Sequence, residues 1–289
     1  MKAPWQPSSP WPTVAVVGVG LIGGSVGLAA KARGVARRVI GIGRSRASLD
    51  EAVARGAVDE ATTDLARGVA EADLVVVAAG VAAIPALLER ADAAARPGTL
   101  LTDAGSTKGS IVAGWERRRR GRRCRFVGAH PIAGSHRKGP VAADAGLFAG
   151  RVTVVTPATR TPAHDAEQVA GFWTALGATV VAMKPAAHDR VLGATSHVPH
   201  LLAAALAAAT PAKALRFTAG GWRDSTRIAA GDPGMWADIL LDNATEVTLG
   251  LARVLRVARR MHRALEAGDR RTLVEILARA KERRDALGS

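Results

Sequence analysis

The sequence GVGLIGGS at residues 18–25 decides the fold class of this chain. The apolar run TVAVV at residues 13–17 precedes it, and an alanine-rich segment at residues 26–33 follows it. A buried strand, a glycine turn and a helix in this order are the context that the Gly-x-Gly-x-x-Gly pattern requires to bind a dinucleotide. The stretch therefore predicts the first strand, turn and helix of a Rossmann-type domain.

Each glycine of the pattern has a physical role in that turn. Gly18 permits the tight turn, Gly20 lets the backbone approach a pyrophosphate, and Gly23 lets the helix pack closely on the strand. The first amides of the helix, which include those of Leu21 and Ile22, offer hydrogen bonds and partial positive charge to the phosphates. We therefore expect these five residues to bind the cofactor.

Strand-like and helix-like segments alternate as far as residue 183. The expected strands span residues 38–45, 58–62, 73–79, 99–103, 126–130, 151–156 and 178–183, and the expected helices include residues 83–95 and 166–176. This alternation is typical of a mostly parallel sheet covered by helices, with room for antiparallel strands at its far edge. We predict an α/β dinucleotide-binding domain over residues 13–185.

The end of the second expected strand bears on the choice of cofactor. NAD-specific domains usually place Asp or Glu there to bind the ribose 2′-hydroxyl, whereas this chain has Gly43, Arg44 and Ser45. NADP is favoured because no carboxylate repels a 2′-phosphate and a guanidinium can bind it. NAD stays possible, since an arginine can also lie over the adenine. We expect Arg44, Ser45 and Ala79 to contact the cofactor.

The second half of the chain predicts only helices. We expect them over residues 187–209, 233–266 and 270–286, in an all-helical dimerisation domain over residues 186–289. The middle helix is amphipathic, and its apolar side comprises Leu240, Leu241, Val247, Leu251, Leu255 and Ala258. Because this surface has few partners within the chain, we expect the domain to complete its core in a homodimer.

The composition of the 289 residues limits the classes of partner. A formal net charge of +15 suggests a nucleic-acid-binding protein. However, arginine greatly outnumbers lysine, Tyr is absent, and the densest basic run, residues 117–120, has no interleaved aromatic residues for base stacking. We therefore expect no nucleic-acid partner, and a positive field that steers anionic substrates and phosphorylated cofactors.

The remaining bulk features indicate a cytoplasmic protein. Residues 1–12 are rich in proline and predict a disordered leader without a signal pattern. No uninterrupted apolar run approaches about 18 residues, so we expect no membrane span. The single Cys124 excludes an internal disulfide and offers no zinc spacing, so no metal site is expected. Its arginine neighbours could favour the thiolate, but an incidental thiol is the simpler interpretation.

Three segments concentrate polar side chains. The run FVGAHPIAGS at residues 126–135 should end a strand at His130, because Pro131 biases the residue before it away from helical geometry, and ligands bind at such strand ends. The run SHVPH at residues 196–200 places two imidazoles around a proline inside a helix. The run GGWRDSTR at residues 220–227 begins a helix with two arginines, which can bind a carboxylate or pair with the aspartate between them.

These residues together resemble a known family. From about residue 13 to its C-terminus, the chain resembles the prephenate and arogenate dehydrogenases, the oxidative decarboxylases of tyrosine biosynthesis. The matching motifs, in the family's order, are GVGLIGGS at 18–25, DAGSTK at 103–108, GAHPIAGS at 128–135, HD at 188–189, SHVPH at 196–200, DSTRIA at 224–229 and DPGMW at 232–236. Several separate motifs in one order make a chance match implausible.

The resemblance implies a role for each matched position. His130 would be the catalytic histidine, which accepts the hydrogen bond of the substrate's ring hydroxyl as hydride leaves for the nicotinamide; a neutral imidazole with a pKa of about 6.5 suits this role. Ser106 would contact His130, the substrate and the cofactor, and Arg227 would bind a substrate carboxylate. The other implied substrate-binding positions are Ser196, His197, His200, Gly221 and Trp236, of which Trp236 can come from the partner subunit.

One departure from the family concerns the choice of substrate. Many prephenate-specific members carry an acidic residue after the His-Pro-Ile-Ala-Gly segment, where it joins a gating ion-pair network in some of them; this chain has SHRK at residues 135–138. The added positive charge suits dianionic prephenate better than zwitterionic arogenate. We therefore favour prephenate as the small-molecule substrate, with arogenate as the close alternative.

Two other interpretations stay open. An NADP enzyme of the 3-hydroxyacid dehydrogenase or imine reductase type would share the two-domain plan. The hydroxyacid enzymes expect a lysine on the first interdomain helix, however, and residues 186–210 contain none. A non-catalytic NADP-binding or nucleic-acid-associated protein would instead have an unreactive His130 and a basic patch away from the cleft.

Overall fold

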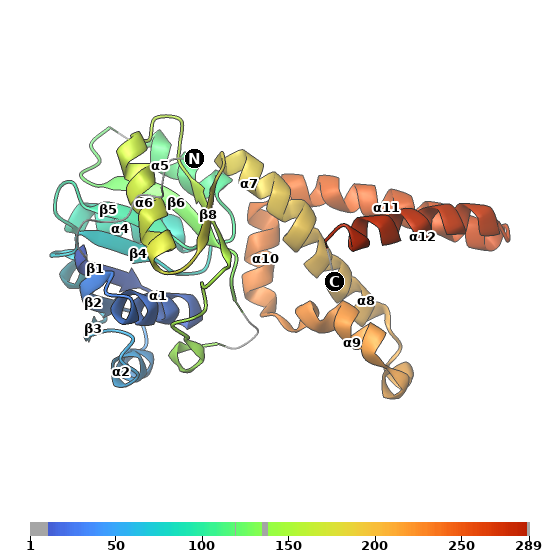
Figure 1. Ribbon diagram of the computed structural model, residues 1–289, viewed down its shortest axis with the longest axis horizontal. Coiled ribbons are helices and arrows are strands. Elements are labelled where there is room, and N and C mark those ends of the chain that lie inside the picture. Colours follow the sequence, from blue (N-terminus) through green and yellow to red (C-terminus); the bar gives the residue numbers. More distant parts are fainter. Residues whose placement is uncertain (1–10, 119, 135–137, 288–289) are drawn as a thin grey trace.

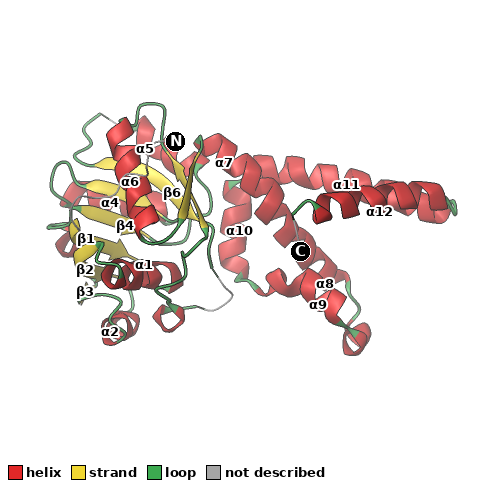
Figure 2. Cartoon of the chain, in the orientation of Figure 1, coloured by secondary structure: helices red, strands yellow, loops and turns green. Residues whose placement is uncertain are grey.

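The computed structural model describes residues 11–118, 120–134 and 138–287 of the chain. Figure 1 shows a domain built on a central sheet and a group of helices that extends away from it. Among the described residues, the strands all lie in the first of these two parts (Figure 2). The expected fold class, a Rossmann-type α/β domain followed by a helical domain, is confirmed.

One sheet of eight strands forms from the described residues, in the order β3-β2-β1-β4-β5-β6-β7-β8. The strands are β1 (Trp11–Val17), β2 (Ala36–Ile42), β3 (Glu60–Thr62), β4 (Leu74–Val77), β5 (Leu100–Asp103), β6 (Arg125–Pro131), β7 (Val152–Thr156) and β8 (Thr179–Ala182). Neighbouring strands pair in parallel except β6 and β7, which run antiparallel. The prediction of a mostly parallel sheet with antiparallel pairing near one edge is confirmed.

The prediction of a disordered leader over residues 1–12 is wrong for its last two residues. Strand β1 begins at Trp11, which is buried and pairs with Ala36 of β2, so Trp11 and Pro12 belong to the sheet. Residues 1–10 lie outside the described part of the chain. The ring of Trp11, next to a run of valines, adds apolar area to the core. The neighbouring prolines had suggested disorder instead.

Helices cover both faces of the sheet. One face carries α1 (Leu21–Ala32), α2 (Arg46–Ala54) and α6 (Ala163–Ala175), and the other carries α3 (Leu65–Val69), α4 (Ile84–Ala94) and α5 (Gly109–Arg117). Successive residues of β1 face opposite layers, with Val14 and Val16 in one cluster and Ala15 and Val17 in the other. Burial on both faces explains why these strands are continuous apolar runs.

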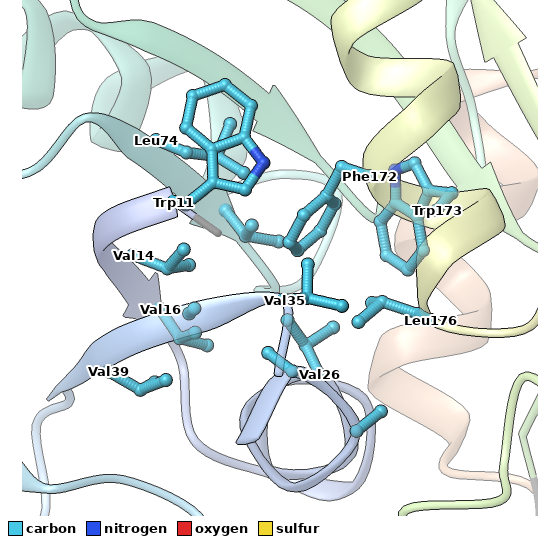
Figure 3. Packing of buried hydrophobic residues seen from close by; sticks show 14 of the residues in the cluster. Trp11, Val14, Val16, Val26, Val35, Val39, Leu74, Phe172, Trp173 and Leu176 are labelled. Atoms are coloured by element: carbon cyan, nitrogen blue, oxygen red, sulfur yellow. The ribbon is translucent and has the colours of Figure 1, made fainter. Parts of the chain in front are cut away.

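The larger core cluster lies between β1, β4 and helices α1 and α6. Figure 3 shows Trp11 and Leu74 on the sheet side and Phe172 and Trp173 on the helix side. Trp173 is fully buried, and its ring meets that of Phe172 edge-on at a centroid distance of 5.6 Å. This packing fixes α6 across the sheet. The strand order reverses between β1 and β4, and ligands bind at such a switch point in open α/β sheets.

The helical domain begins directly after the sheet, since β8 ends at Ala182 and α7 begins at Pro185. Its elements are α7 (Pro185–Leu192), the π-helical turn η2 (Gly193–His197), α8 (Val198–Ala209), α9 (Gly220–Thr226), α10 (Pro233–Asp242), α11 (Ala244–Glu266) and α12 (Arg270–Asp285). Short 3₁₀ turns lie at Pro140–Ala142, Ala212–Phe217 and Arg227–Ala230. Helices α11 and α12 form an arm that projects away from the sheet domain (Figure 1).

Two expected helices are interrupted. The helix predicted over residues 187–209 contains the π-helical turn that ends at His197, two residues before Pro199, which lacks the amide that a regular helix needs. The helix predicted over residues 233–266 breaks at Asn243, whose backbone has φ −106° and ψ 29°. The buried side chain of Asn243 bonds to groups of α7 and the π-helical turn, and the break lets it reach them.

Much of the apolar surface expected to pack in a dimer is exposed in the single chain. Leu241 is 74% exposed, and Leu255 and Ala258 of α11 are exposed as well, whereas Val247 is buried. Helix α12 covers only part of α11. The described residues therefore leave much of the apolar side of this arm uncovered.

The segment Pro185–Ala209 is long and apolar enough to cross a membrane by length and composition alone. Core helices pass the same test. This segment also carries His188, Asp189 and His197, which are buried and hydrogen-bonded within the protein. These polar residues interrupt the apolar run, and the segment joins the two domains.

The basic run at residues 117–125 contributes to packing within the chain. Arg122 lies 4.1 Å from the ring centroid of Trp115 and pairs with Glu89 at 2.6 Å. Burial, reinforced by a nearby carboxylate, raises the pKa of the Cys124 thiol to about 12. The thiolate that the neighbouring arginines could have favoured is therefore not the form present at neutral pH.

Candidate active site

The glycine turn leaves open space where the expected phosphates would lie. Gly18 has φ +97°, and a Cβ there would lie 2.3 Å from the carbonyl oxygen of Ala78 at the end of β4. A Cβ on Gly23 would lie 1.9 Å from the oxygen of Gly18, so helix and turn touch closely. A Cβ on Gly20 would meet nothing within 4 Å, and no side chain caps α1 there. Among the described residues, no side chain therefore accepts a hydrogen bond from the first amides of α1, at Leu21 and Ile22.

The end of β2 carries the expected determinants of cofactor choice. The strand ends at Ile42, three residues before its expected end, and Arg44 follows as an exposed side chain. Ser45 has a structural task, because its Oγ accepts the amide of Ser48 at 3.3 Å and caps α2. Ala79, after β4, is half-buried beside the glycine turn.

His130 lies at the carboxyl end of β6, as expected, although the strand continues to Pro131. It is buried, with 9% of its surface exposed. Its Nδ1 lies 2.8 Å from Nε2 of His188, on the first helix of the other domain. The hydrogen bond to His188 uses Nδ1 of His130, and no bond of Nε2 to another described residue is seen. Burial, and then the charges of His188 and Lys108, hold the pKa of His130 well below its usual value, so the ring is neutral at pH 7.

Asp189 joins His188 to the sheet domain. Its Oδ1 lies 2.8 Å from Nδ1 of His188, and it accepts the amides of Lys108 at 2.8 Å and Gly109 at 2.7 Å. Burial would raise the pKa of this carboxyl, but the hydrogen bonds from His188 and the two amides outweigh burial and lower it. Asp189 is therefore a carboxylate that connects α7 to the start of α5.

Lys108 is a fully buried lysine directly beneath His130. Its Nζ donates to the carboxylate of Asp103 and, at 2.9 Å, to the carbonyl oxygen of Ala129. Asp103 also accepts the amides of Gly105 at 2.9 Å and Ala129 at 3.1 Å. Burial lowers the pKa of Lys108, and Asp103 partly offsets this effect. These contacts fasten the end of β5 to the residue that precedes His130.

His197 is joined to the same junction through Asn243. Asn243 donates from its amide nitrogen to the carbonyl oxygen of Asp189 at 2.8 Å, and the same nitrogen lies 3.0 Å from Nδ1 of His197. Burial lowers the pKa of His197 to about 4. The ring is therefore neutral at physiological pH, as is expected of a histidine sealed between helices.

His200 and Trp236 form a stacked pair near this junction. Their ring centroids are 3.5 Å apart with planes inclined by 14°, and His197 meets Trp236 edge-on at 6.3 Å. A Cβ on Gly231 would lie 2.4 Å from the indole nitrogen of Trp236. Nδ1 of His200 is buried without a partner among the described residues, and burial lowers the pKa of His200. A buried imidazole with an unused nitrogen is suited to meet a polar group of a ligand.

Not every expected site residue joins this cluster. Ser106 and Ser196 are half-buried, and within the described residues no hydrogen bond links Ser106 to His130. Gly221 and Arg227 are exposed, on α9 and the 3₁₀ turn after it, and neither bonds to the clustered histidines within the described part of the chain. The sequence departure at residues 135–138 lies mostly outside the described residues. Of it, Lys138 is described, and it pairs with Asp232 of the helical domain at 2.7 Å.

Several residues of the cluster were missed as site residues. His188, Asp189, Lys108 and Asn243 were not among the expected positions, although the first three lie in quoted family motifs. The available signal was the His-Asp pair on an apolar interdomain helix, since charged and polar residues seldom lie there without partners. The lysine that a 3-hydroxyacid dehydrogenase would place on that helix is absent from residues 186–210.

No group of three or more metal-binding side chains has suitable geometry within the described residues. A pocket of about 530 Å³ opens between α4 and α5. Trp115 and Arg118 are among the residues that line it, and none of the clustered histidines does. This pocket therefore does not coincide with the residues clustered around His130.

Comparisons with known proteins agree with this geometry. The family description "Prephenate dehydrogenase, nucleotide-binding domain" matches residues 26–182, and "Prephenate dehydrogenase, dimerization domain" matches residues 184–279. Prephenate dehydrogenase of Bacillus subtilis is 36% identical over 282 residues, which cover 95% of this chain and 76% of that protein.

Solved structures agree over nearly the whole chain. The prephenate dehydrogenase of A. aeolicus, in complex with hydroxyphenyl propionate and NAD+, has a TM-score of 0.88 at 29% identity, covering 97% of this chain and 99% of that one. The arogenate dehydrogenase of Synechocystis has a TM-score of 0.80 at 26% identity, covering 95% and 99%. With both of its domains matched in order, this chain belongs to the prephenate dehydrogenase family and is a dehydrogenase that uses a nicotinamide dinucleotide.

Proposed function

We propose that this dehydrogenase converts prephenate to 4-hydroxyphenylpyruvate by oxidative decarboxylation, with NADP as the favoured hydride acceptor. The observation that carries the proposal is His130, a buried and uncharged imidazole that His188 holds through Nδ1, with no partner at Nε2 among the described residues. An imidazole with one free nitrogen is the general base that oxidation of a hydroxyl group needs. Arogenate is the alternative substrate.

The residues at the carboxyl ends of β1 and β4 fit a dinucleotide. The open space at Gly20 leaves room for a pyrophosphate, and the first amides of α1 provide hydrogen bonds for it. The bound nicotinamide would supply the acceptor for hydride. Arg44 supports NADP over NAD, because it is exposed after β2 with no carboxylate beside it to repel a 2′-phosphate.

His130 would hold the proton that the reaction releases. As hydride leaves the ring carbon, the hydroxyl proton passes to Nε2 of His130, and the oxygen becomes a ketone. That ketone can accept the electrons released when carbon dioxide leaves, and aromatisation makes the loss effectively irreversible. The low pKa of His130 ensures that the imidazole begins this step unprotonated at neutral pH.

The residues around the histidine cluster would hold the substrate. We assign His200 and Trp236 to its ring and side chain, because they stack beside the interdomain junction, and His197 would support them from behind through its edge-on contact with Trp236. Ser106, Ser196, Gly221 and Arg227 would complete the site, with Arg227 as the partner of a carboxylate. The net charge of +15 favours the dianion prephenate over the zwitterion arogenate.

We also propose that the protein is a homodimer. The C-terminal family match is to a dimerization domain, and α10 and α11 expose large apolar residues. Leu241 is 74% exposed, Leu265 67% and Leu249 50%. Large apolar side chains left exposed along adjoining helices fit a surface that packs against another subunit. The molar mass in solution, measured by light scattering, tests this assignment.

Initial rates with purified protein test the proposed function. Prephenate and arogenate are each crossed with NADP and NAD, and reduced nicotinamide is followed by absorbance. The proposal expects the highest kcat/KM with prephenate and NADP. A preference for arogenate would overturn the substrate assignment, and a preference for NAD would overturn the cofactor assignment. A folded protein that is inactive in all four mixtures would contradict the proposed reaction.

A further inference from the structure

The proton positions on His130 follow from its partners in the helical domain. We propose that His188 and Asp189 are positioning residues that hold His130 with its proton on Nδ1 and leave Nε2 bare for the substrate hydroxyl. The inference rests on the proposed function for its catalytic meaning. Its structural part, the choice of tautomer, stands on the hydrogen bonds alone.

The first step concerns Asp189, whose partners can only donate. The amides of Lys108 and Gly109 both donate to its carboxylate, at 2.8 and 2.7 Å. A carboxylate in this setting is an acceptor at every oxygen. Nδ1 of His188, 2.8 Å away, must therefore carry a proton and donate it to Asp189.

In the second step, the position of the proton on His188 determines the position of the proton on His130. With its proton on Nδ1, a neutral His188 has a bare Nε2, which can only accept. That atom lies 2.8 Å from Nδ1 of His130, so Nδ1 of His130 must donate. A neutral His130 then has a bare Nε2. Each of the two hydrogen bonds among the three side chains therefore contains one proton. His130 donates to His188, and His188 donates to Asp189.

This array, the hydrogen-bonded series His130, His188 and Asp189, would also stabilise the positive charge that develops on His130 in the reaction. When Nε2 of His130 takes the hydroxyl proton, the O–H electron pair becomes part of the new carbonyl bond, and hydride passes to the oxidised nicotinamide. The resulting imidazolium still donates through Nδ1 to His188, and the Asp189 carboxylate lies at the other end of this series of hydrogen bonds. In serine proteases a buried aspartate orients and stabilises a catalytic histidine in a comparable way.

The array crosses the domain boundary twice. His130 is supplied by β6 of the sheet domain, and His188 and Asp189 by α7 of the helical domain. Asp189 then returns to the sheet domain by accepting the amides at the start of α5, and Asn243 donates to its backbone carbonyl oxygen at 2.8 Å. The two domains must therefore be packed as observed for His130 to have its tautomer set.

The first test measures the tautomer directly and needs no substrate. Imidazole ¹⁵N shifts of the full chain labelled at histidine distinguish a proton on Nδ1 from one on Nε2, and His130→Asn assigns the signal. We expect His130 as the Nδ1–H form at pH 7. An Nε2–H form of His130, or a His188 protonated on both nitrogens, would overturn the proposal.

A matched pair of variants tests the catalytic consequence. His188→Gln keeps a side-chain oxygen able to accept from Nδ1 of His130, whereas His188→Leu removes the acceptor at similar volume. We expect His188→Leu to lose at least about 10²-fold in kcat with little change in KM, and His188→Gln to stay within about tenfold of the parent. Equal losses of kcat in the two variants, both folded and with the same ¹⁵N shifts at His130, would show a merely structural role.

Failure of this inference and failure of the proposed function give different results. If the parent protein turns over neither prephenate nor arogenate, the proposed function fails, yet the ¹⁵N shifts still report the tautomer. If turnover is found and His130 carries its proton on Nε2, the function stands and the positioning role of His188 and Asp189 is wrong. Asp242→Asn serves as the control, since this carboxylate at the same junction accepts the Ser110 hydroxyl at 2.7 Å and forms no hydrogen bond with His130 or His188 among the described residues.

Discussion

The rings of His200 and Trp236 stack face to face within one chain, with centroids 3.5 Å apart and planes inclined by 14°. His200 comes from α8 and Trp236 from α10, so the stack fixes the relative position of two helices beside the interdomain junction. Gly231 leaves room for the indole, because a Cβ there would lie 2.4 Å from its nitrogen. Trp236 therefore orients His200, whose Nδ1 is buried and unpartnered among the described residues.

Replacing Trp236 should weaken substrate binding more than catalysis. Trp236→Leu removes a stack worth about 1 kcal/mol and frees the His200 ring, so we expect KM to rise about three- to tenfold while kcat changes little. Steady-state kinetics measure both values. Trp222→Leu is the control, since Trp222 donates to Thr210 at the C-terminal end of α8 and should leave KM unchanged. If both variants raised KM equally, the assignment of Trp236 to the site would be wrong.

The rate should stay high at unusually low pH. Burial, and then the charges of His188, Lys108 and His197, lower the pKa of His130 well below its usual value, and the neutral ring is the active form. We therefore expect kcat/KM to stay constant as pH falls through about 6.5, and to decline only at more acidic pH. The titratable groups that act on His130 are His188 on α7, Lys108 before α5 and His197 on the π-helical turn. A decline centred near pH 6.5 would contradict this account.

The stability of the fold should depend on pH over the same range. His197 has a pKa of about 4 in the folded protein against about 6.5 when unfolded, so the unfolded chain binds more protons below pH 6.5. Stability is thus fully present above pH 6.5 and is lost as pH falls toward 4, by on the order of 3 kcal/mol from this residue. Denaturant unfolding at several pH values measures the loss. His197→Asn, which keeps an acceptor for Asn243, should show a shallower dependence, and an identical one would exclude His197 as its source.

Cofactor preference should follow Arg44. Arg44→Asp removes a charge-assisted contact with a 2′-phosphate and adds a repelling carboxylate, so we expect KM for NADP to rise at least about tenfold and the preference to move toward NAD. Kinetics with both cofactors measure the ratio. Arg55→Asp, the same change at the other end of α2, should leave the ratio unaltered. If Arg44→Asp left it unaltered as well, the 2′-phosphate would be recognised elsewhere.

The parts of the site that depend on local sequence could be predicted. The glycine turn between β1 and α1 has a spacing that local sterics dictate, and His130 before Pro131 marks a strand end by the geometry that proline imposes. His197 and His200 stood out as polar residues in an apolar helix. Each of these signals lies within a few residues of chain.

The parts that depend on distant contacts could not be predicted. His130 and His188 are 58 residues apart, and Asp189 accepts amides that are 80 and 81 residues away. The local sequence around each residue therefore does not predict these hydrogen bonds. The break at Asn243 has the same origin. Residues 235–249 contain no glycine or proline to end a helix, and the break accompanies the buried contacts of the Asn243 amide with Asp189 and His197.

The most direct test of the account is the dependence of the coupled reaction on His130. Purified protein is mixed with prephenate and NADP, and reduced nicotinamide and released carbon dioxide are measured in the same sample, for the parent and for His130→Asn. We expect equal amounts of the two products from the parent. The variant should bind NADP normally but lose at least about a hundredfold in kcat. A His130→Asn variant as active as the parent would contradict the assignment of His130 as the base.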